Sequence, residues 1–331
     1  MTGHNAPFAN LLDYGELAPV PEPLGGVLAP YLRHYRLDEA LPMAAGLDAG
    51  QIDCAGYRLW VQRWRPAQPP HGTVVVVHGY FDHLGLYRHL LKTLLAAGWQ
   101  VILWDLPGHG LSSGERAAID DFADYIHCLQ ALTDQLDERA LMQGPWIGIG
   151  QSTGGAILAT DALSRREHSP WQALVLLAPL VRPCGWKRAR WLHDIAGPFV
   201  RSIPRTHHPN STDADFVAFL RHGDPLQAER LPLVWVRAMR RWMARFCMLS
   251  PRALPVLILQ GEQDATVDWR WNLQVLAAQF PMARIERNTR ARHHLVNEHE
   301  TLRQPLFTVL LDFVEAQRND NVASVHCEIS P

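Results

Sequence analysis

The stretch that decides the fold is PWIGIGQSTGGAIL, residues 145–158. Its apolar run at residues 146–149 is typical of a short buried strand, and residues 153–163 have the pattern of a helix with small residues in its first turn. The sequence Gly-x-Ser-x-Gly lies between them, with Ser152 at its centre. This pattern predicts a sharp strand-to-helix turn that exposes the Ser152 hydroxyl and directs the free N–H groups of the helix towards the same point.

The same letter pattern recurs at residues 110–114, with Ser112 at its centre. This copy ends a loop that glycine and proline interrupt, LPGHG at residues 106–110, and it joins no strand directly to a helix. We therefore interpret Ser112 as part of a connection and Ser152 as the candidate nucleophile.

Strand and helix signals alternate on both sides of Ser152. The run TVVVV at residues 73–77 predicts a strand that is buried on both faces, as in a parallel sheet covered by helices. The alternation predicts an α/β fold with a mostly parallel, doubly wound sheet. Further strands are expected at residues 57–64 (an outer strand), 101–105, 173–178, 256–260 and 283–287.

The alternation stops at residues 182–252, where aromatic and basic helical patterns replace it. We expect an inserted helical cap there, above the sheet edge at which open α/β sheets bind ligands. The hydrolase core is then expected at residues 46–181 and 253–318. Residues 1–45 are rich in proline and glycine and are expected to wrap the surface or stay loose, and residues 319–331 form a C-terminal tail.

The composition limits the class of protein. With 331 residues, 47% hydrophobic and 19% charged, the chain can build a sizeable core and is not of the disordered class. Its formal net charge of −2 gives no argument for nucleic-acid binding. The five cysteines include no CxxC pair, so we expect reduced, buried thiols. The sequence shows no secretory signal and no apolar run that spans a bilayer, and a cytoplasmic location is expected.

The expected cap carries 13 Lys plus Arg against 5 acidic residues, an excess of +8. One interpretation is peripheral contact with an anionic head group or the inner membrane face. The other, which we favour, is a solvated helical surface with some arginines paired to acids of the core. The aromatic residues of the cap either line an acyl tunnel or only pack together: Trp186, Trp191, Phe199, Phe216, Phe219, Trp235 and Trp242.

A serine nucleophile needs a general base, and an acid that orients the base. Asp264 directly follows the strand expected at residues 256–260 and is the predicted acid, with Asp268 and Glu262 as nearby rivals.

The base should follow the strand at residues 283–287, and both His293 and His294 do so. Spacing alone does not separate them. A metal site formed by these two residues and His299 lacks an HExxH or comparable ligand spacing, so no metal is expected. His78 and His109 are expected to brace loops through hydrogen bonds.

Together these residues resemble the lysophospholipase and monoacylglycerol lipase branch of the α/β-hydrolase superfamily over about residues 50–315. The resemblance is carried by the serine motif, by Asp264 and by three further patterns. These are HGxxxH at residues 78–83, DxxGHGxSxG at residues 105–114 and ARHHLxxE at residues 291–298.

The resemblance also implies roles for single residues. The catalytic histidine of that branch stands five positions before a glutamate, which favours His293, with Glu298, over His294. The backbone N–H groups of Tyr80 and Thr153 would form the oxyanion hole. Family members commonly carry a small residue in place of Tyr80, so a tyrosine there is expected to reshape the acyl pocket.

The resulting hypothesis is a serine esterase without a cofactor, acting on a lysophospholipid or a monoacylglycerol. A peptidase or amidase of the same superfamily is the alternative within enzymes, because the triad does not choose the leaving group. If the protein is not an enzyme, the alternative is a non-catalytic ligand-binding protein with the same fold. The sequence predicts no oligomeric state.

Overall fold

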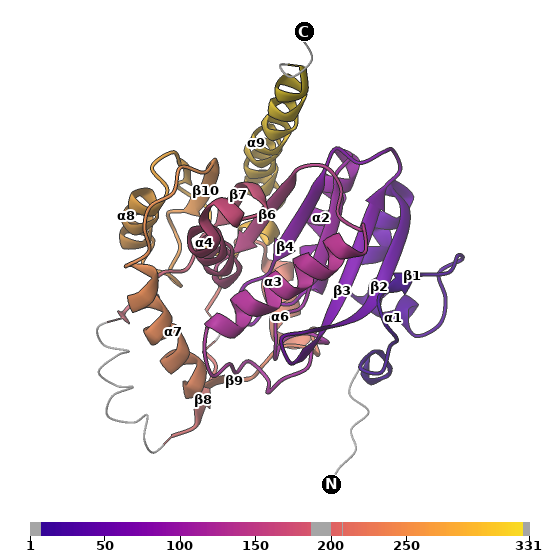
Figure 1. Ribbon diagram of the computed structural model, residues 1–331. Helices are drawn as coiled ribbons and strands as arrows, with labels where there is room; N and C mark the ends of the chain where they lie inside the picture. Colours follow the sequence, from indigo (N-terminus) through magenta and orange to yellow (C-terminus); the bar gives the residue numbers. More distant parts are fainter. Residues whose placement is uncertain (1–7, 187–199, 207, 327–331) are drawn as a thin grey trace.

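The computed structural model describes residues 8–186, 200–206 and 208–326 (Figure 1). A nine-stranded sheet forms its centre. The strands are β1 (Ala18–Pro19), β2 (Ala44–Cys54), β3 (Tyr57–Pro66), β4 (Thr73–Val77), β5 (Gln100–Trp104), β6 (Trp146–Gln151), β7 (Trp171–Leu177), β10 (Val256–Gly261) and β11 (Arg284–Asn288).

The strands follow the order β1-β2-β3-β5-β4-β6-β7-β10-β11. All neighbours from β5 to β11 are parallel, whereas β3 pairs antiparallel with both β5 and β2, and β1 pairs antiparallel with β2. This topology confirms the predicted mostly parallel α/β sheet.

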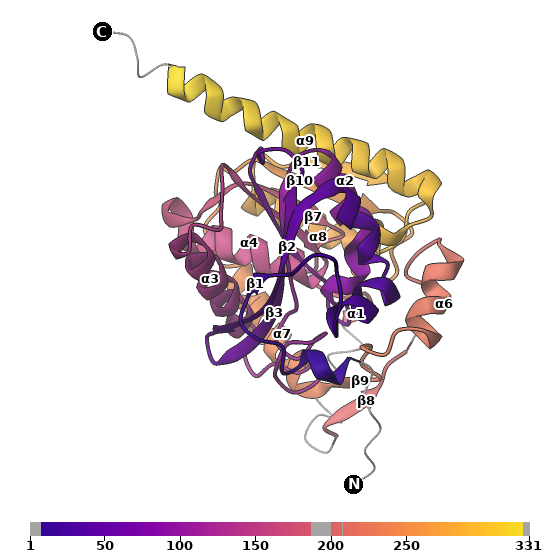
Figure 2. The same cartoon turned by 90° about the vertical axis from the view of Figure 1, so that its right-hand side faces the viewer.

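Helices cover both faces of the sheet (Figures 1 and 2). One face packs against α3 (Ala123–Glu138), α4 (Thr153–Arg165) and α8 (Trp269–Gln279). The other packs against α1 (Leu28–His34), α2 (Arg88–Ala96) and α9 (Glu300–His326). Residues 319–326, which were expected to begin a tail, continue α9.

The strand β4 shows why the sheet is covered on both sides. Its five residues are all buried. Because side chains alternate along a strand, Val75 and Val77 enter the hydrophobic cluster on one face and Val74 and Val76 enter the cluster on the other. A continuous β-branched run therefore requires two covered faces, as the sequence indicated.

The N-terminal segment differs from the sequence expectation. It contributes β1 to the sheet, and its helix α1 buries Leu28, Tyr31 and Leu32, each at most 1% exposed. Two short 3-10 helices, Ala9–Leu11 and Leu37–Met43, complete the segment. Its prolines and glycines alternate with apolar residues, and the apolar residues pack on the core from one side of the sheet. Because β1 and β2 extend the sheet, β3 is the third strand from the edge rather than an outer one.

The cap contains β8 (Ser202–Pro204), α6 (Ala214–His222), β9 (Arg230–Pro232) and α7 (Leu233–Phe246), with β8 and β9 paired antiparallel. The aromatic and basic helix expected at residues 186–191 lies, apart from Trp186, outside the described residues, as does Phe199. Within residues 8–186, 200–206 and 208–326, no helix combines the length and apolar character needed to cross a bilayer.

A buried polar junction joins the N-terminal segment, the core and the cap. The carboxylate of Asp224, between α6 and β9, accepts a hydrogen bond from Tyr35 Oη at 2.8 Å and lies 3.0 Å from His83 Nε2. The side chains of His83 and Asp224 are fully buried. Burial raises the pKa of Asp224, but His83, Gln227 and Tyr35 outweigh it and bring the pKa to about 2. The carboxylate is therefore charged, and its hydrogen bonds fix the cap to two other segments.

Replacing Tyr35 with Phe should lower the free energy of unfolding by about 1–3 kcal/mol, because the buried Asp224 carboxylate loses a donor without any change in shape. Urea unfolding of the full chain measures the difference. Tyr14→Phe is the matched control, since Tyr14 packs on Trp60 but its hydroxyl has no hydrogen-bond partner among the described residues. Equal losses in the two variants would contradict the role given to the junction.

Candidate active site

Ser152 stands at the junction of β6 and α4, with φ of 52° and ψ of −110°. L-residues rarely adopt such a backbone conformation. The turn fits only because its neighbours are glycines: a Cβ on Gly150 would lie 2.5 Å from the carbonyl carbon of Gly154, and one on Gly154 would lie 2.0 Å from Val77 O. The Ser152 N–H donates to Leu177 O at 2.8 Å and ties the turn to the neighbouring strand.

Ser112 has a different environment. Its hydroxyl accepts a hydrogen bond from Trp60 N at 2.9 Å and donates one to Asp105 O at 2.6 Å. The first contact holds the loop against β3 and the second holds it at the end of β5, in agreement with the interpretation of this motif as a connection.

A histidine and an aspartate meet beside the turn. His293 Nδ1 lies 2.7 Å from Asp264 Oδ2, and the carboxylate also accepts hydrogen bonds from Thr266 N at 2.7 Å, Val267 N at 3.1 Å and Gln260 Nε2 at 3.1 Å. Burial raises the pKa of Asp264, but His293 and the N–H donors lower it by more. Burial lowers the pKa of His293, but Asp264 raises it by more. The pair therefore favours a charged carboxylate that orients a basic imidazole.

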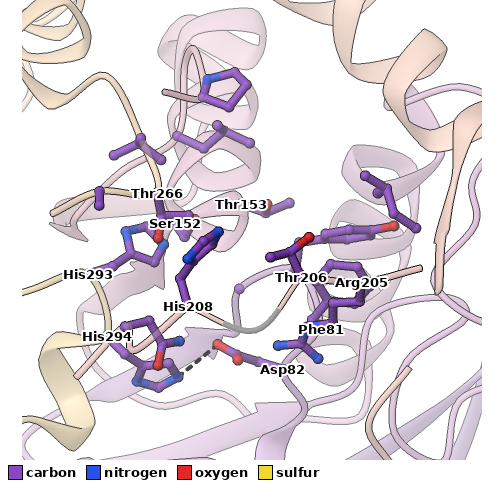
Figure 3. A pocket seen from close by; sticks show the side chains of 18 of the residues that line it. Phe81, Asp82, Ser152, Thr153, Arg205, Thr206, His208, Thr266, His293 and His294 are labelled. Carbon is purple, nitrogen blue, oxygen red and sulfur yellow. Dashed lines mark hydrogen bonds and ion pairs between the residues drawn. The ribbon is translucent and has the colours of Figure 1, made fainter. Parts of the chain in front are cut away.

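Figure 3 shows that the ring of His293 lies next to Ser152 at one side of the cavity. The structure thus brings together Ser152, Asp264 and His293, the three residues that the sequence proposed for catalysis. The rival acids lie elsewhere: Asp268 caps α8 and pairs with Arg182, and Glu262 pairs with Arg287 on the sheet edge.

The neighbouring His294 has a separate partner. Its Nε2 lies 3.0 Å from Asp82 Oδ2, and the same carboxylate accepts a hydrogen bond from Tyr87 Oη at 3.2 Å. The Tyr87 hydroxyl accepts from Gly79 N at 3.2 Å. Burial raises the pKa of Asp82, but His294 lowers it by more. This pair, which the sequence reasoning missed, braces the loop after β4.

Other motif residues act as loop braces too. His78 Nε2 accepts a hydrogen bond from Leu106 N at 2.9 Å, and His109 Nδ1 lies 2.9 Å from Pro107 O, as expected for loop contacts.

Glu298 is fully buried. It accepts hydrogen bonds from Arg292 N and from both the N–H and the hydroxyl of Thr212. Glu298 therefore links the loop that carries His293 to the cap.

The proposed oxyanion donors, Tyr80 and Thr153, both line the cavity that contains Ser152. Thr153 is the first residue of α4, a position whose N–H has no acceptor within a helix. Among the described residues, no acceptor takes the N–H of Tyr80. The Tyr80 side chain is held aside: its hydroxyl donates to Ala117 O at 2.6 Å, and its ring stacks on Trp235 with centroids 3.8 Å apart.

The cavity has a volume of about 470 Å³ and lies where the loops after β4, β6, β7 and β10 meet the cap. Of the cap aromatics among the described residues, Trp235 lines it. The others are packing residues: Trp242 stacks on Phe122 at 4.5 Å, and Phe219 contacts Tyr35 of the N-terminal segment. Of the five described residues in this set, Trp235 alone lines the cavity, and the other four fit the packing interpretation.

The thiols are less buried than expected. Cys54 and Cys128 are buried, but Cys184 and Cys247 are exposed. Cys184 also lines the cavity, because it lies on the chain that leaves the core for the cap.

The sheet order and the sharp turn at Ser152 define the α/β-hydrolase class. Residues 68–300 match the family described as serine aminopeptidase, S33, and the chain belongs to this family. The resemblance to α/β-hydrolases noted in the sequence is thereby confirmed.

Individual relatives agree with this assignment. The chain is 34% identical to a monoacylglycerol lipase of Mycolicibacterium smegmatis over 38% of this chain and 44% of the relative. It is 31% identical to human monoglyceride lipase over 39% of this chain and 42% of the relative. The chain thus spans less than half the length of these two curated relatives. The crystal structure of Paleococcus ferrophilus monoacylglycerol lipase has the same fold, with a TM-score of 0.67, 21% identity and coverage of 78% of this chain and 99% of that one.

The raised pKa of His293 predicts the pH dependence of turnover. A general base must be neutral to accept a proton, so kcat/KM should rise with pH through a pKa above the ordinary histidine value of about 6.5. In Asp264→Asn the raising influence is lost, so the acidic limb should move to lower pH while kcat falls by about 10⁴-fold.

Initial rates with p-nitrophenyl acetate from about pH 5 to about pH 9 measure both effects. Asp268→Asn is the matched control and should leave the limb in place, because Asp268 contacts Arg182 and not His293. If the acidic limb of the kcat/KM profile stays at the same pH in Asp264→Asn, a group other than His293 determines that limb.

Proposed function

We propose that this protein is a serine hydrolase that cleaves carboxylic esters of lipids. Ser152 is the nucleophile, His293 is the general base and Asp264 orients the base. The observation that supports this most directly is the strained turn at Ser152 beside an imidazole whose Nδ1 lies 2.7 Å from a buried carboxylate.

The mechanism follows from these positions. His293 Nε2 takes the hydroxyl proton while Ser152 Oγ attacks the ester carbonyl carbon, and Asp264 holds the tautomer and stabilises the imidazolium. The backbone N–H groups of Tyr80 and Thr153 stabilise the tetrahedral oxyanion, and each such donor contributes about 10²–10³ in rate. His293 then returns the proton to the leaving alcohol. Water, activated by the same imidazole, hydrolyses the acyl-enzyme.

A lipid ester suits the walls of the cavity. Apolar side chains from the core and the cap surround it, and each methylene of an acyl chain buried there would contribute about 0.8 kcal/mol. The two lipases reported above support a lipid ester, whereas the family description leaves an aminopeptidase as the alternative. The apolar lining includes Leu180, Ile203, Val217, Leu220, Leu231, Trp235 and Met239.

Contact of the basic cap with an anionic membrane remains a prediction from the sequence. Several cap arginines pair with acids of the core: Arg182 with Asp268, and Arg241 and Arg245 with Asp121. These pairs favour the interpretation of a solvated surface for that part of the cap.

Wild-type protein should hydrolyse a monoacylglycerol or a lysophospholipid, and Ser152→Ala should lose that turnover by about 10⁴-fold or more. Ser112→Ala is the matched serine control and should keep it, provided circular dichroism shows that the variant is folded. Free fatty acid release measures both.

An aminoacyl p-nitroanilide belongs in the same assay. Cleavage of the anilide alone would replace the lipase proposal with the peptidase alternative. Folded wild-type protein that cleaves neither substrate would favour the non-catalytic binding protein.

A further inference from the structure

Arg205 is a cationic side chain of the cap that lines the cavity and has no role in the mechanism. Arg205 follows β8 and lines the same cavity as Ser152. Its guanidinium carbon lies 4.2 Å from the ring centroid of Phe81, and Nη1 donates to Gln227 Oε1. These contacts on two sides fix the guanidinium in place, so its charge has a defined position in the cavity.

Within the described part of the chain, no ion pair balances the charge of Arg205. Among residues 8–186, 200–206 and 208–326, no carboxylate forms an ion pair with it. The two acids that influence it at longer range, Asp82 and Asp224, are bound to His294 and His83. Its side chain is half-buried, and burial lowers its pKa. A partly desolvated cation of this kind costs free energy, which an anionic ligand would offset.

The cavity as a whole favours a negative charge at one side. Among the described residues that line it, Arg221 is a second arginine and Asp82 is the one carboxylate. Figure 3 shows Arg205 and Phe81 on the side of the cavity away from His293. A ligand with its ester at Ser152 and an anionic group further along would therefore meet the guanidinium.

We propose that Arg205 binds the phosphate of a lysophospholipid head group and makes lysophospholipids the preferred substrate class over neutral monoacylglycerols. This inference rests on the proposed function. In a lysophospholipid one glycerol unit carries both the scissile ester and the phosphate, so both groups enter the same cavity. The planar guanidinium offers several N–H donors to phosphate oxygens, and such charge-assisted hydrogen bonds are among the stronger ones in proteins.

A purely structural role for Arg205 makes a different prediction. If the guanidinium only supports the loop that carries Phe81 and Tyr80, its loss would lower turnover of every ester by the same factor, through kcat. Binding of the head group instead lowers kcat/KM for the phosphate-bearing lipid, mainly through KM.

The test compares decanoyl lysophosphatidylglycerol with monodecanoylglycerol, both below their critical micelle concentrations. The measured quantity is kcat/KM for the phospholipid divided by kcat/KM for the neutral ester. In Arg205→Gln this ratio should fall about tenfold or more, and the fall should come from a higher KM for the phospholipid. Arg205→Lys should restore much of the ratio, because the charge is retained. The control is Arg201→Gln, an exposed cap arginine in a neighbouring surface depression outside this cavity, which should leave the ratio unchanged.

Binding separates this inference from the proposed function. In Ser152→Ala, the tryptophan fluorescence of the cavity reports binding of the two lipids without turnover. Tighter binding of the phospholipid that depends on Arg205 supports the head-group site even if no ester is hydrolysed. Equal binding with and without Arg205, an unchanged kcat/KM ratio, or an equal loss for both substrates would overturn it.

Discussion

The positive φ of Ser152 is the constraint on which the candidate site depends. A residue held in such a conformation costs about 1–3 kcal/mol, so the surrounding structure must enforce it. Here the enforcement comes from the central strands: Gly150 and Gly154 allow backbone contact that no Cβ would permit, and Leu177 O holds the Ser152 N–H. The same turn starts α4 at Thr153, so one local distortion places both the hydroxyl and an unpaired N–H at the sheet edge.

Three buried histidine–aspartate pairs hold the general base, the loop after β4 and the cap in place around this turn. His293 with Asp264 presents a base to Ser152, and His294 with Asp82 braces the loop after β4. The third pair joins His83 to Asp224 of the cap, and Tyr35 adds the N-terminal segment to it. Pairing offsets the cost of burying each charge, and removal of one partner from a buried pair is strongly destabilising. The cap is therefore attached to the core through the same loops that build the cavity.

Local sequence patterns predicted the parts of this structure that local chemistry determines. The valine run of β4 and the glycines around Ser152 each have one physical solution, so the sheet and the turn could be predicted from them. The choice between His293 and His294 could not be made by spacing, because adjacent side chains point in different directions and each finds an aspartate far away in the sequence.

Two further features depend on contacts between distant segments. The prolines and glycines of the N-terminal segment suggested a loosely attached segment. Its side chains Leu28, Tyr31 and Leu32 are nevertheless buried against the core. Arg205 is one of 13 basic residues of the cap in sequence, and its contact with Phe81 is formed only after the cap packs on the core. The positions of the cap aromatics could not be predicted from the sequence for the same reason. Whether each one lines the cavity or packs depends on which distant side chain it contacts.

Trapping of the acyl-enzyme tests the central claim most directly. Wild-type protein is mixed with p-nitrophenyl decanoate, quenched in acid within the first turnovers, digested and analysed by mass spectrometry. The account predicts a decanoyl group on Ser152, with none on Ser112. An acyl group on another residue, or release of p-nitrophenol with no acylated peptide at any quench time, would contradict it.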